Sequence, residues 1–207
     1  MSKAKVSHPA ADAMDWNEAI GLIQRLTRDG RYRDSMIIAS GCMLGLRVSD
    51  LLLLKWKDIL GNDILTVTEK KTGKTRRLKI NKAISEQAAR CYREMKVTDT
   101  DEYIFNSSHF GGKKPLTRIR IHQLLKQIQK DYDVHTAKVF SCHTLRKTFG
   151  RRIWLNECKQ GRGDQALELL KELFGHAHVL ITKRYLGIRQ EEILALYDKL
   201  IDDEKNT

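Results

Sequence analysis

The 207-residue sequence has few of the features that mark a secreted, membrane-bound or disordered protein. It contains only two prolines, and 41% of its residues are hydrophobic, which excludes a collagen-like or mostly disordered chain. No apolar run approaches the roughly 20 residues of a transmembrane helix, and the N-terminus lacks the apolar centre of a signal peptide. Its four cysteines are scattered without a CxxC pair, which argues against a disulfide framework or a zinc ribbon. These absences predict a cytoplasmic protein without membrane contact, of a length that fits one globular domain.

Acidic residues are outnumbered, and the imbalance is uneven along the chain. There are 38 Lys and Arg against 26 Asp and Glu, a formal charge of +12, although residues 186–207 hold three basic and six acidic side chains. Two basic clusters stand out: Lys70, Lys71, Lys74, Arg76, Arg77 and Lys79, and then Lys113, Lys114, Arg118, Arg120, Lys126 and Lys130. Either cluster alone fits an ordinary solvated face, but two together favour a surface that binds a nucleic acid.

Apolar periodicity predicts a mainly α-helical fold with one small antiparallel hairpin, an α+β class. Asp15 and Glu18 have the spacing of a capping box at the start of a first helix, and Gly30 is its stop signal. Further helices are expected at residues 32–44, 49–54, 82–96, 117–130, 144–159, 164–174 and 189–201. Residues 64–68 and 76–80 alternate apolar and polar side chains around a Gly-containing turn, which predicts the hairpin. We expect residues 1–14 to form a flexible arm, 15–187 the main domain, and 188–207 a C-terminal helix with an acidic tail.

Several residues have side chains suited to phosphodiester chemistry. Arg47, at an expected junction between two helices, can place two N–H groups on a phosphate; a structural salt bridge with Asp50 is the alternative. His143 and Arg146 are three residues apart, so both emerge on one face of the first turns of a helix that begins near Ser141. A capping histidine and a surface arginine are the alternative there.

A second group lies near the C-terminus. His176 follows Gly175, a plausible helix stop, and precedes Tyr185 by nine residues, about 13 Å along one continuous helix. A turn must therefore intervene for both to meet one phosphate, and Thr182 is a candidate cap for a short helix containing Tyr185. Metal sites are weakly indicated, because His176 and His178 lack a third nearby ligand and the one DxD, at residues 131–133, lacks partner carboxylates.

Four segments, GLRVSDLLLLKWKDI, KKTGKTRRLKI, SCHTLRKTFGRRI and LFGHAHVLITKRYLG, occur in the order and spacing of the catalytic domain of tyrosine recombinases, the phage-integrase family. The resemblance covers about residues 15–187 and implies that catalytic-domain fold. By position, Arg47 and Arg146 resemble the two phosphate-clamping arginines and Lys71 the hairpin lysine. His143 and His176 resemble the active-site imidazoles, and Tyr185 the nucleophile. Lys70 takes the role of Lys71 if the register differs by one residue.

The resemblance implies a site-specific DNA recombinase of bacterial or phage origin, associated with the nucleoid. It would cleave and rejoin double-stranded DNA through a 3′-phosphotyrosine, in integration, excision or inversion, without a metal or cofactor. It would act as a homo-oligomer, a tetramer in synapsis, with a possible accessory DNA-bending protein. The candidate DNA contacts are Lys70, Lys74, Arg76, Arg77, Lys113, Lys114, Arg118 and Arg120.

The sequence leaves alternatives for the function, for the part before the first helix and for the C-terminal segment. A non-catalytic DNA-binding regulator of the same fold, or a topoisomerase, would carry a similar basic surface. Only 14 residues precede the first helix, where most relatives have a separate core-binding domain, so the chain is either a catalytic fragment or a short family member. Its C-terminal segment, 188–207, either docks on a neighbouring protomer or packs on its own domain.

Overall fold

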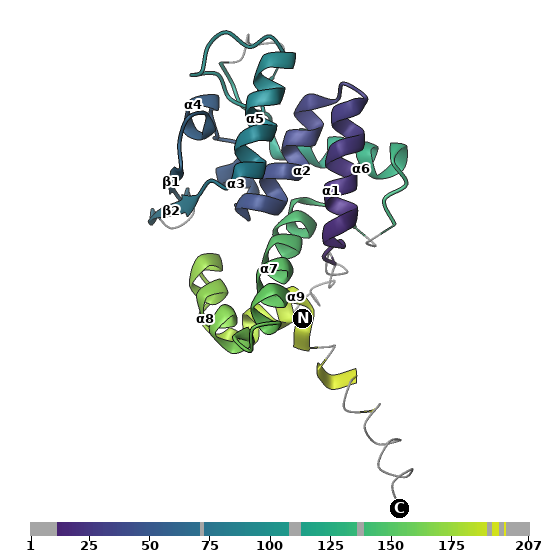
Figure 1. The fold of residues 1–207 in the computed structure, drawn as a ribbon, viewed down its shortest axis with the longest axis vertical. Coiled ribbons are helices and arrows are strands. Elements are labelled where there is room, and N and C mark those ends of the chain that lie inside the picture. Colours follow the sequence, from purple (N-terminus) through teal and green to yellow (C-terminus); the bar gives the residue numbers. More distant parts are fainter. Residues whose placement is uncertain are drawn as a thin grey trace, which may run out of the picture. The chain divides into compact units, whose positions relative to one another are not determined.

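The computed structural model describes residues 12–70, 73–107, 113–135, 139–189, 192–194 and 197. They form two compact units: unit 1 ends at Phe149 and unit 2 begins at Gly150, so the division falls inside helix α7 (Cys142–Cys158). The described chain is mainly helical with a two-stranded antiparallel sheet, which confirms the predicted fold class (Figure 1). The arm, main-domain and tail limits stay predictions, and residues 1–11 of the arm lie outside the described residues.

Unit 1 is built around one almost entirely buried helix, α2. Its helices are α1 (Trp16–Arg28), α2 (Tyr32–Leu44), α3 (Val48–Leu51), α4 (Trp56–Ile59), α5 (Lys82–Glu94), α6 (Arg118–Asp131) and the first part of α7. Helix α1 begins as its sequence predicts, because the Asp15 carboxylate accepts hydrogen bonds from the backbone N–H groups of Asn17 and Glu18 at 2.7 and 3.1 Å. Helix α2 lies against α1 and α5, so its apolar side chains form the centre of the core (Figure 1).

The predicted hairpin is present. Strands β1 (Ile64–Thr68) and β2 (Thr75–Lys79) pair antiparallel, with Ile64 opposite Lys79 and Thr68 opposite Thr75. Strand β2 thus begins one residue before the predicted 76–80. The helix expected at 49–54 is the shorter α3, and the four-residue α4 was not predicted, because so short a helix shows no periodicity. Lys71, the predicted hairpin lysine, lies outside the described residues.

Unit 2 contains the second part of α7, followed by α8 (Gly163–Phe174) and α9 (Val179–Leu186). The three pack closely at Gly150, where a Cβ atom would lie 2.7 Å from Leu186 and 2.9 Å from Phe174. Of the helix predicted at 189–201, the structure describes helical backbone at Arg189, at residues 192–194 and at Tyr197. Within the described residues, none of the helices combines the length and apolar character needed to span a membrane.

Candidate active site

Arg47 stands at the connection between α2 and α3. Helix α2 ends at Gly45, whose φ of +60° is the left-handed conformation that glycine adopts readily, and Arg47 occupies the N-cap position of α3 with extended backbone. Its Nη1 lies 2.6 Å from Oε1 of Glu69, a carboxylate on the hairpin. The structure thus shows an ion pair of Arg47 with Glu69, a partner that was not among the expected ones. The Asp50 carboxylate accepts the backbone N–H of Lys70 at 3.1 Å.

Arg146 belongs to the same region of unit 1. Helix α7 begins at Cys142, two residues before the predicted 144, so His143 and Arg146 lie in its first two turns. Arg146 is only 7% exposed, and its Nη1 donates a hydrogen bond to the backbone carbonyl of Gly45. Since Gly45 is two residues before Arg47, this bond ties the second arginine to the connection that carries the first.

The surroundings of His143 favour a neutral imidazole. The residue is exposed by its overall accessibility, yet the protein around the ring desolvates it, and this desolvation is the largest cause of its lowered pKa. The positive charges of Arg146 and Lys147 lower the pKa of His143 further, as does the electrostatic effect of the nearby His122. An imidazole that is neutral near pH 7 can accept a proton, and the cations that surround it attract a phosphate.

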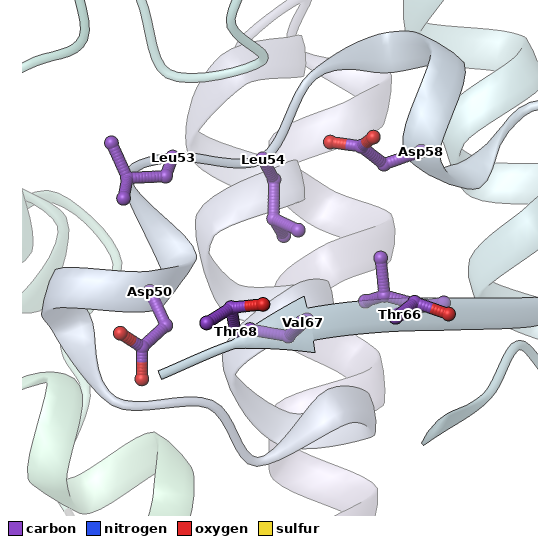
Figure 2. A pocket seen from close by; sticks show the side chains of 8 residues that line it. Asp50, Leu53, Leu54, Asp58, Thr66, Val67 and Thr68 are labelled. Atoms are coloured by element: carbon purple, nitrogen blue, oxygen red, sulfur yellow. The ribbon is translucent and has the colours of Figure 1, made fainter. Parts of the chain in front are cut away.

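A pocket of about 160 Å³ lies beside the hairpin (Figure 2). It is lined by Asp50, Leu53, Leu54, Asp58, Leu65, Thr66, Val67 and Thr68. Both of its carboxylates bind backbone N–H groups, Asp50 that of Lys70 and Asp58 that of Lys55. None of the predicted site residues lines this pocket, so it is distinct from the candidate active site.

His176 and Tyr185 meet in unit 2. Gly175 ends α8 in the left-handed conformation, the next helix begins at Val179, and the chain turns between them as the prediction required. The ring centroids of His176 and Tyr185 are 5.3 Å apart, with the planes at 72°. Phe174 contacts both rings, at 5.5 Å from His176 and 5.4 Å from Tyr185. The nine-residue separation is thus closed by the turn.

Thr182 has a role that its sequence position did not suggest. It lies inside α9 rather than at its start, where His178 takes the N-cap position. The Thr182 side chain is fully buried, and its Oγ1 is 3.0 Å from Nδ1 of His176. One feature of the sequence could have indicated that Thr182 lies near the predicted site: Thr182 and Tyr185 are three residues apart, so they share a helix face. The sequence analysis also did not name Glu69 as a site residue, although an acid beside a basic cluster indicates an ion pair.

The predicted DNA contacts are mostly at the surface. Lys70, Lys74, Arg77, Lys113, Lys114, Arg118 and Arg120 are exposed. Arg76 differs, because it is half-buried and its Nε lies 2.9 Å from the Glu69 carboxylate. The acids of the DxD contact other side chains: Asp131 pairs with Arg31 at 2.6 Å, and Asp133 lies 2.9 Å from Nε2 of His135. In the described ranges, no three His, Cys, Asp or Glu side chains gather as metal ligands.

The arrangement agrees with the comparisons with known proteins. The model of the phage integrase family matches residues 14–192, nearly the whole of the two units. The chain belongs to this family. The integrase fold and the enzyme class predicted from the four segments are therefore confirmed, because tyrosine recombinases are enzymes that cleave and rejoin DNA.

Individual relatives support the same assignment. The probable integrase/recombinase YoeC of Bacillus subtilis is 28% identical over 180 residues, 87% of this chain and 91% of YoeC. Tyrosine recombinase XerA of Pyrococcus furiosus is 26% identical over 190 residues, 91% of this chain but only 62% of XerA. The crystal structure of the site-specific recombinase XerH, in a post-cleavage complex with its palindromic difH substrate, has a TM-score of 0.64 and 19% identity. It covers 96% of this chain and 56% of XerH.

Proposed function

We propose that this integrase-family chain is a site-specific recombinase in which six residues act on one DNA phosphate: Arg47, Lys71, His143, Arg146, His176 and Tyr185. The observation that carries the proposal is the contact of Tyr185 with His176, together with the bond that ties Arg146 to the turn before Arg47. A phenol beside an imidazole supplies a nucleophile, and two arginines supply a phosphate clamp.

In the cleavage step, the Tyr185 oxygen attacks phosphorus, a P–O bond to tyrosine forms, and the P–O bond to the 5′ oxygen breaks. The products are a 3′-phosphotyrosine and a 5′-hydroxyl. We assign the phenolic proton to the neutral imidazole of His143, and the proton that the leaving oxygen takes up to Lys71. Arg47, Arg146 and His176 donate to the charge that grows on the non-bridging oxygens, and removing one such donor commonly costs on the order of 10² to 10³ in rate.

The covalent intermediate keeps the energy of the broken phosphodiester. A 5′-hydroxyl, from the same strand or another, attacks the phosphotyrosine and restores a phosphodiester while Tyr185 leaves, so no ATP is consumed. Exchange between two sites then gives integration, excision or inversion according to their placement. The named relatives are integrases and recombinases, which favours this reading over a non-catalytic regulator or a topoisomerase.

The partner that we propose is double-stranded DNA, bound through the exposed lysines and arginines of the two basic clusters. Each phosphate neutralised releases counterions, so the binding constant should fall steeply as salt rises. We propose further that the chain forms a homo-oligomer on DNA, a tetramer in synapsis, and that an accessory DNA-bending protein assists it. For the first part of the C-terminal segment, the burial of Ile188 and the 2.6 Å ion pair of Lys183 with Glu192 support packing on its own domain.

A covalent-adduct experiment tests the proposal directly. The DNA next to the gene is sequenced and searched for inverted or direct repeats. Nicked duplexes that carry candidate repeats are then incubated with the parent chain and separated by denaturing electrophoresis. We expect a protein–DNA adduct with the parent and with Tyr197→Phe, a control at an exposed tyrosine, and none with Tyr185→Phe. Retardation under native conditions alone would favour a regulator. Relaxation of plasmids of any sequence without recombinants would favour a topoisomerase.

The clamp is tested by comparing two arginines. Arg146→Ala should reduce cleavage of bound DNA at least about 100-fold while weakening binding little, because one phosphate contact among many is removed. The exposed Arg118→Ala, which also removes one contact among many, should weaken binding by a similarly small amount and leave the cleavage rate of bound DNA unchanged. Since Arg146 also bonds the Gly45 carbonyl, Arg146→Lys is measured as a second variant. Cleavage by Arg146→Ala equal to that of the parent would contradict the clamp.

A further inference from the structure

Glu69 is a buried carboxylate between two arginines. Its side chain is 5% exposed, and the same oxygen, Oε1, lies 2.6 Å from Nη1 of Arg47 and 2.9 Å from Nε of Arg76. A buried carboxylate is stable only when it is paired, so the two guanidinium groups offset its cost of desolvation. Arg47 is thereby held by a group that belongs to the hairpin and not to its own helix.

The backbone of Glu69 is fixed as well. Its N–H donates to the carbonyl of Lys74 at 2.9 Å, and its carbonyl accepts the N–H of Gly73 at 2.8 Å, so Glu69 closes the hairpin just beyond the last strand pair. The adjacent N–H of Lys70 is bound to Asp50 on α3. Glu69 is therefore a carboxylate with a defined position, anchored on both sides.

We infer that Glu69 is a positioning residue for DNA cleavage, which holds the Arg47 guanidinium where it meets the scissile phosphate. The inference rests on the proposed function. A guanidinium carries five N–H donors, so Arg47 can keep its ion pair with Glu69 and donate to a phosphate oxygen at the same time. An arginine that is oriented before DNA arrives loses less rotamer freedom on binding and is in place when charge develops. Arg76 supports the carboxylate from the other side.

The opposite role for Glu69 would be inhibition. If the carboxylate occupied the place of the phosphate, DNA would have to displace it, and its removal would accelerate cleavage. Displacement would move a buried side chain out of its contacts with two arginines, and the hairpin backbone holds Glu69 in place. Positioning is therefore the role that the contacts support, and the two roles predict opposite changes in rate.

The test compares two substitutions that remove the same charge. Glu69→Gln is compared with Glu86→Gln, since Glu86 is 66% exposed and lies 3.7 Å from Lys82 on the surface of α5. Single-turnover cleavage of a nicked duplex is measured at saturating protein, and binding by titration. We expect Glu69→Gln to lower the cleavage rate about 10- to 100-fold, as loss of an orienting partner commonly does, with the dissociation constant nearly unchanged. Glu86→Gln should change neither. Unchanged or faster cleavage by Glu69→Gln would overturn the inference.

Two further measurements separate positioning of Arg47 from other roles. In an Arg47→Lys background, Glu69→Gln should slow cleavage by a much smaller factor than in the parent, because both substitutions remove the same function, the oriented Arg47 guanidinium. Full additivity would overturn the inference. The second measurement uses a substrate with sulfur at the 5′ bridging position, because its thiolate leaves without taking up a proton. Glu69→Gln should cleave this substrate more slowly than the parent does, as it cleaves the ordinary one. Relief of this defect would assign Glu69 to the leaving group.

Folding and activity controls keep the outcome interpretable. Circular dichroism and thermal unfolding show whether Glu69→Gln is folded. If it is not, Glu69→Asp, which keeps the charge on a shorter side chain, is measured instead and should show a smaller loss of the same kind; a rate equal to that of the parent would overturn the inference. Absence of any adduct with the parent chain would overturn the proposed function and the assignment of Glu69 with it, whereas an adduct with the parent and an unchanged rate with Glu69→Gln would overturn the assignment alone.

Discussion

Gly45 offers a sharp test, because it is the turn that brings Arg47 and Arg146 together. Its φ is +60°, and a Cβ atom built on it would lie 2.3 Å from Cδ1 and 2.6 Å from Cε1 of Phe149. Gly61 has a similar φ of +72°, but nothing lies within 4 Å of a Cβ there. Gly45→Ala and Gly61→Ala therefore share a backbone cost and differ in steric cost.

The expected losses in the free energy of unfolding follow from the backbone cost and the steric cost. A left-handed conformation costs an L-residue about 1 kcal/mol, which both variants should lose from their free energy of unfolding. Forcing a methyl group into a packed site costs about 1–3 kcal/mol more, which only Gly45→Ala should lose. If the steric cost is about 2 kcal/mol, a chain of this size should show a melting temperature about 4–8 °C lower for Gly45→Ala than for Gly61→Ala.

Thermal unfolding followed by tryptophan fluorescence measures the stability of both variants. We also expect Gly45→Ala to cleave DNA more slowly. The Gly45 carbonyl accepts a hydrogen bond from the Arg146 guanidinium, so a shift of the turn displaces Arg146. Gly61→Ala should cleave at the parental rate. Equal melting temperatures for the two variants would refute the packing argument, and parental cleavage by a folded Gly45→Ala would refute the link between the turn and the clamp.

Three further predictions concern single side chains. Because its folded-state pKa lies below the ordinary 6.5, His143 should make the protein less stable as pH falls below that value, where the unfolded chain takes up the proton first. His143→Asn should flatten this dependence below pH 6.5, and identical pH profiles of the two proteins would be inconsistent with it. A thiol reagent should modify Cys158 in the native protein and all four cysteines after unfolding, because the other three are buried; rapid native labelling of more than one would contradict the fold. Thr182→Val should slow cleavage about tenfold or more by removing the hydroxyl beside the His176 imidazole, whereas Thr182→Ser should keep most of the rate, and equal rates for the two would argue against orientation by that hydroxyl.

The sequence determined the local structure and the inventory of chemistry. Helix α1 starts at its capping Asp15 and α8 ends at Gly175, because capping depends on residues a few positions apart. The hairpin followed from alternation with period two. The four ordered segments predicted the family, since side-chain types in a fixed order specify which reactions a site can perform.

The tertiary structure alone decided which side chains act as partners. Arg47 pairs with Glu69 across 22 positions of sequence, and Arg146 donates to a carbonyl 101 positions away. Thr182, expected as a helix cap, is buried beside His176. Such choices depend on distances between packed elements and on burial, which local patterns do not encode. For this reason the candidate reacting groups could be proposed from the sequence, while the side chains that contact them could not.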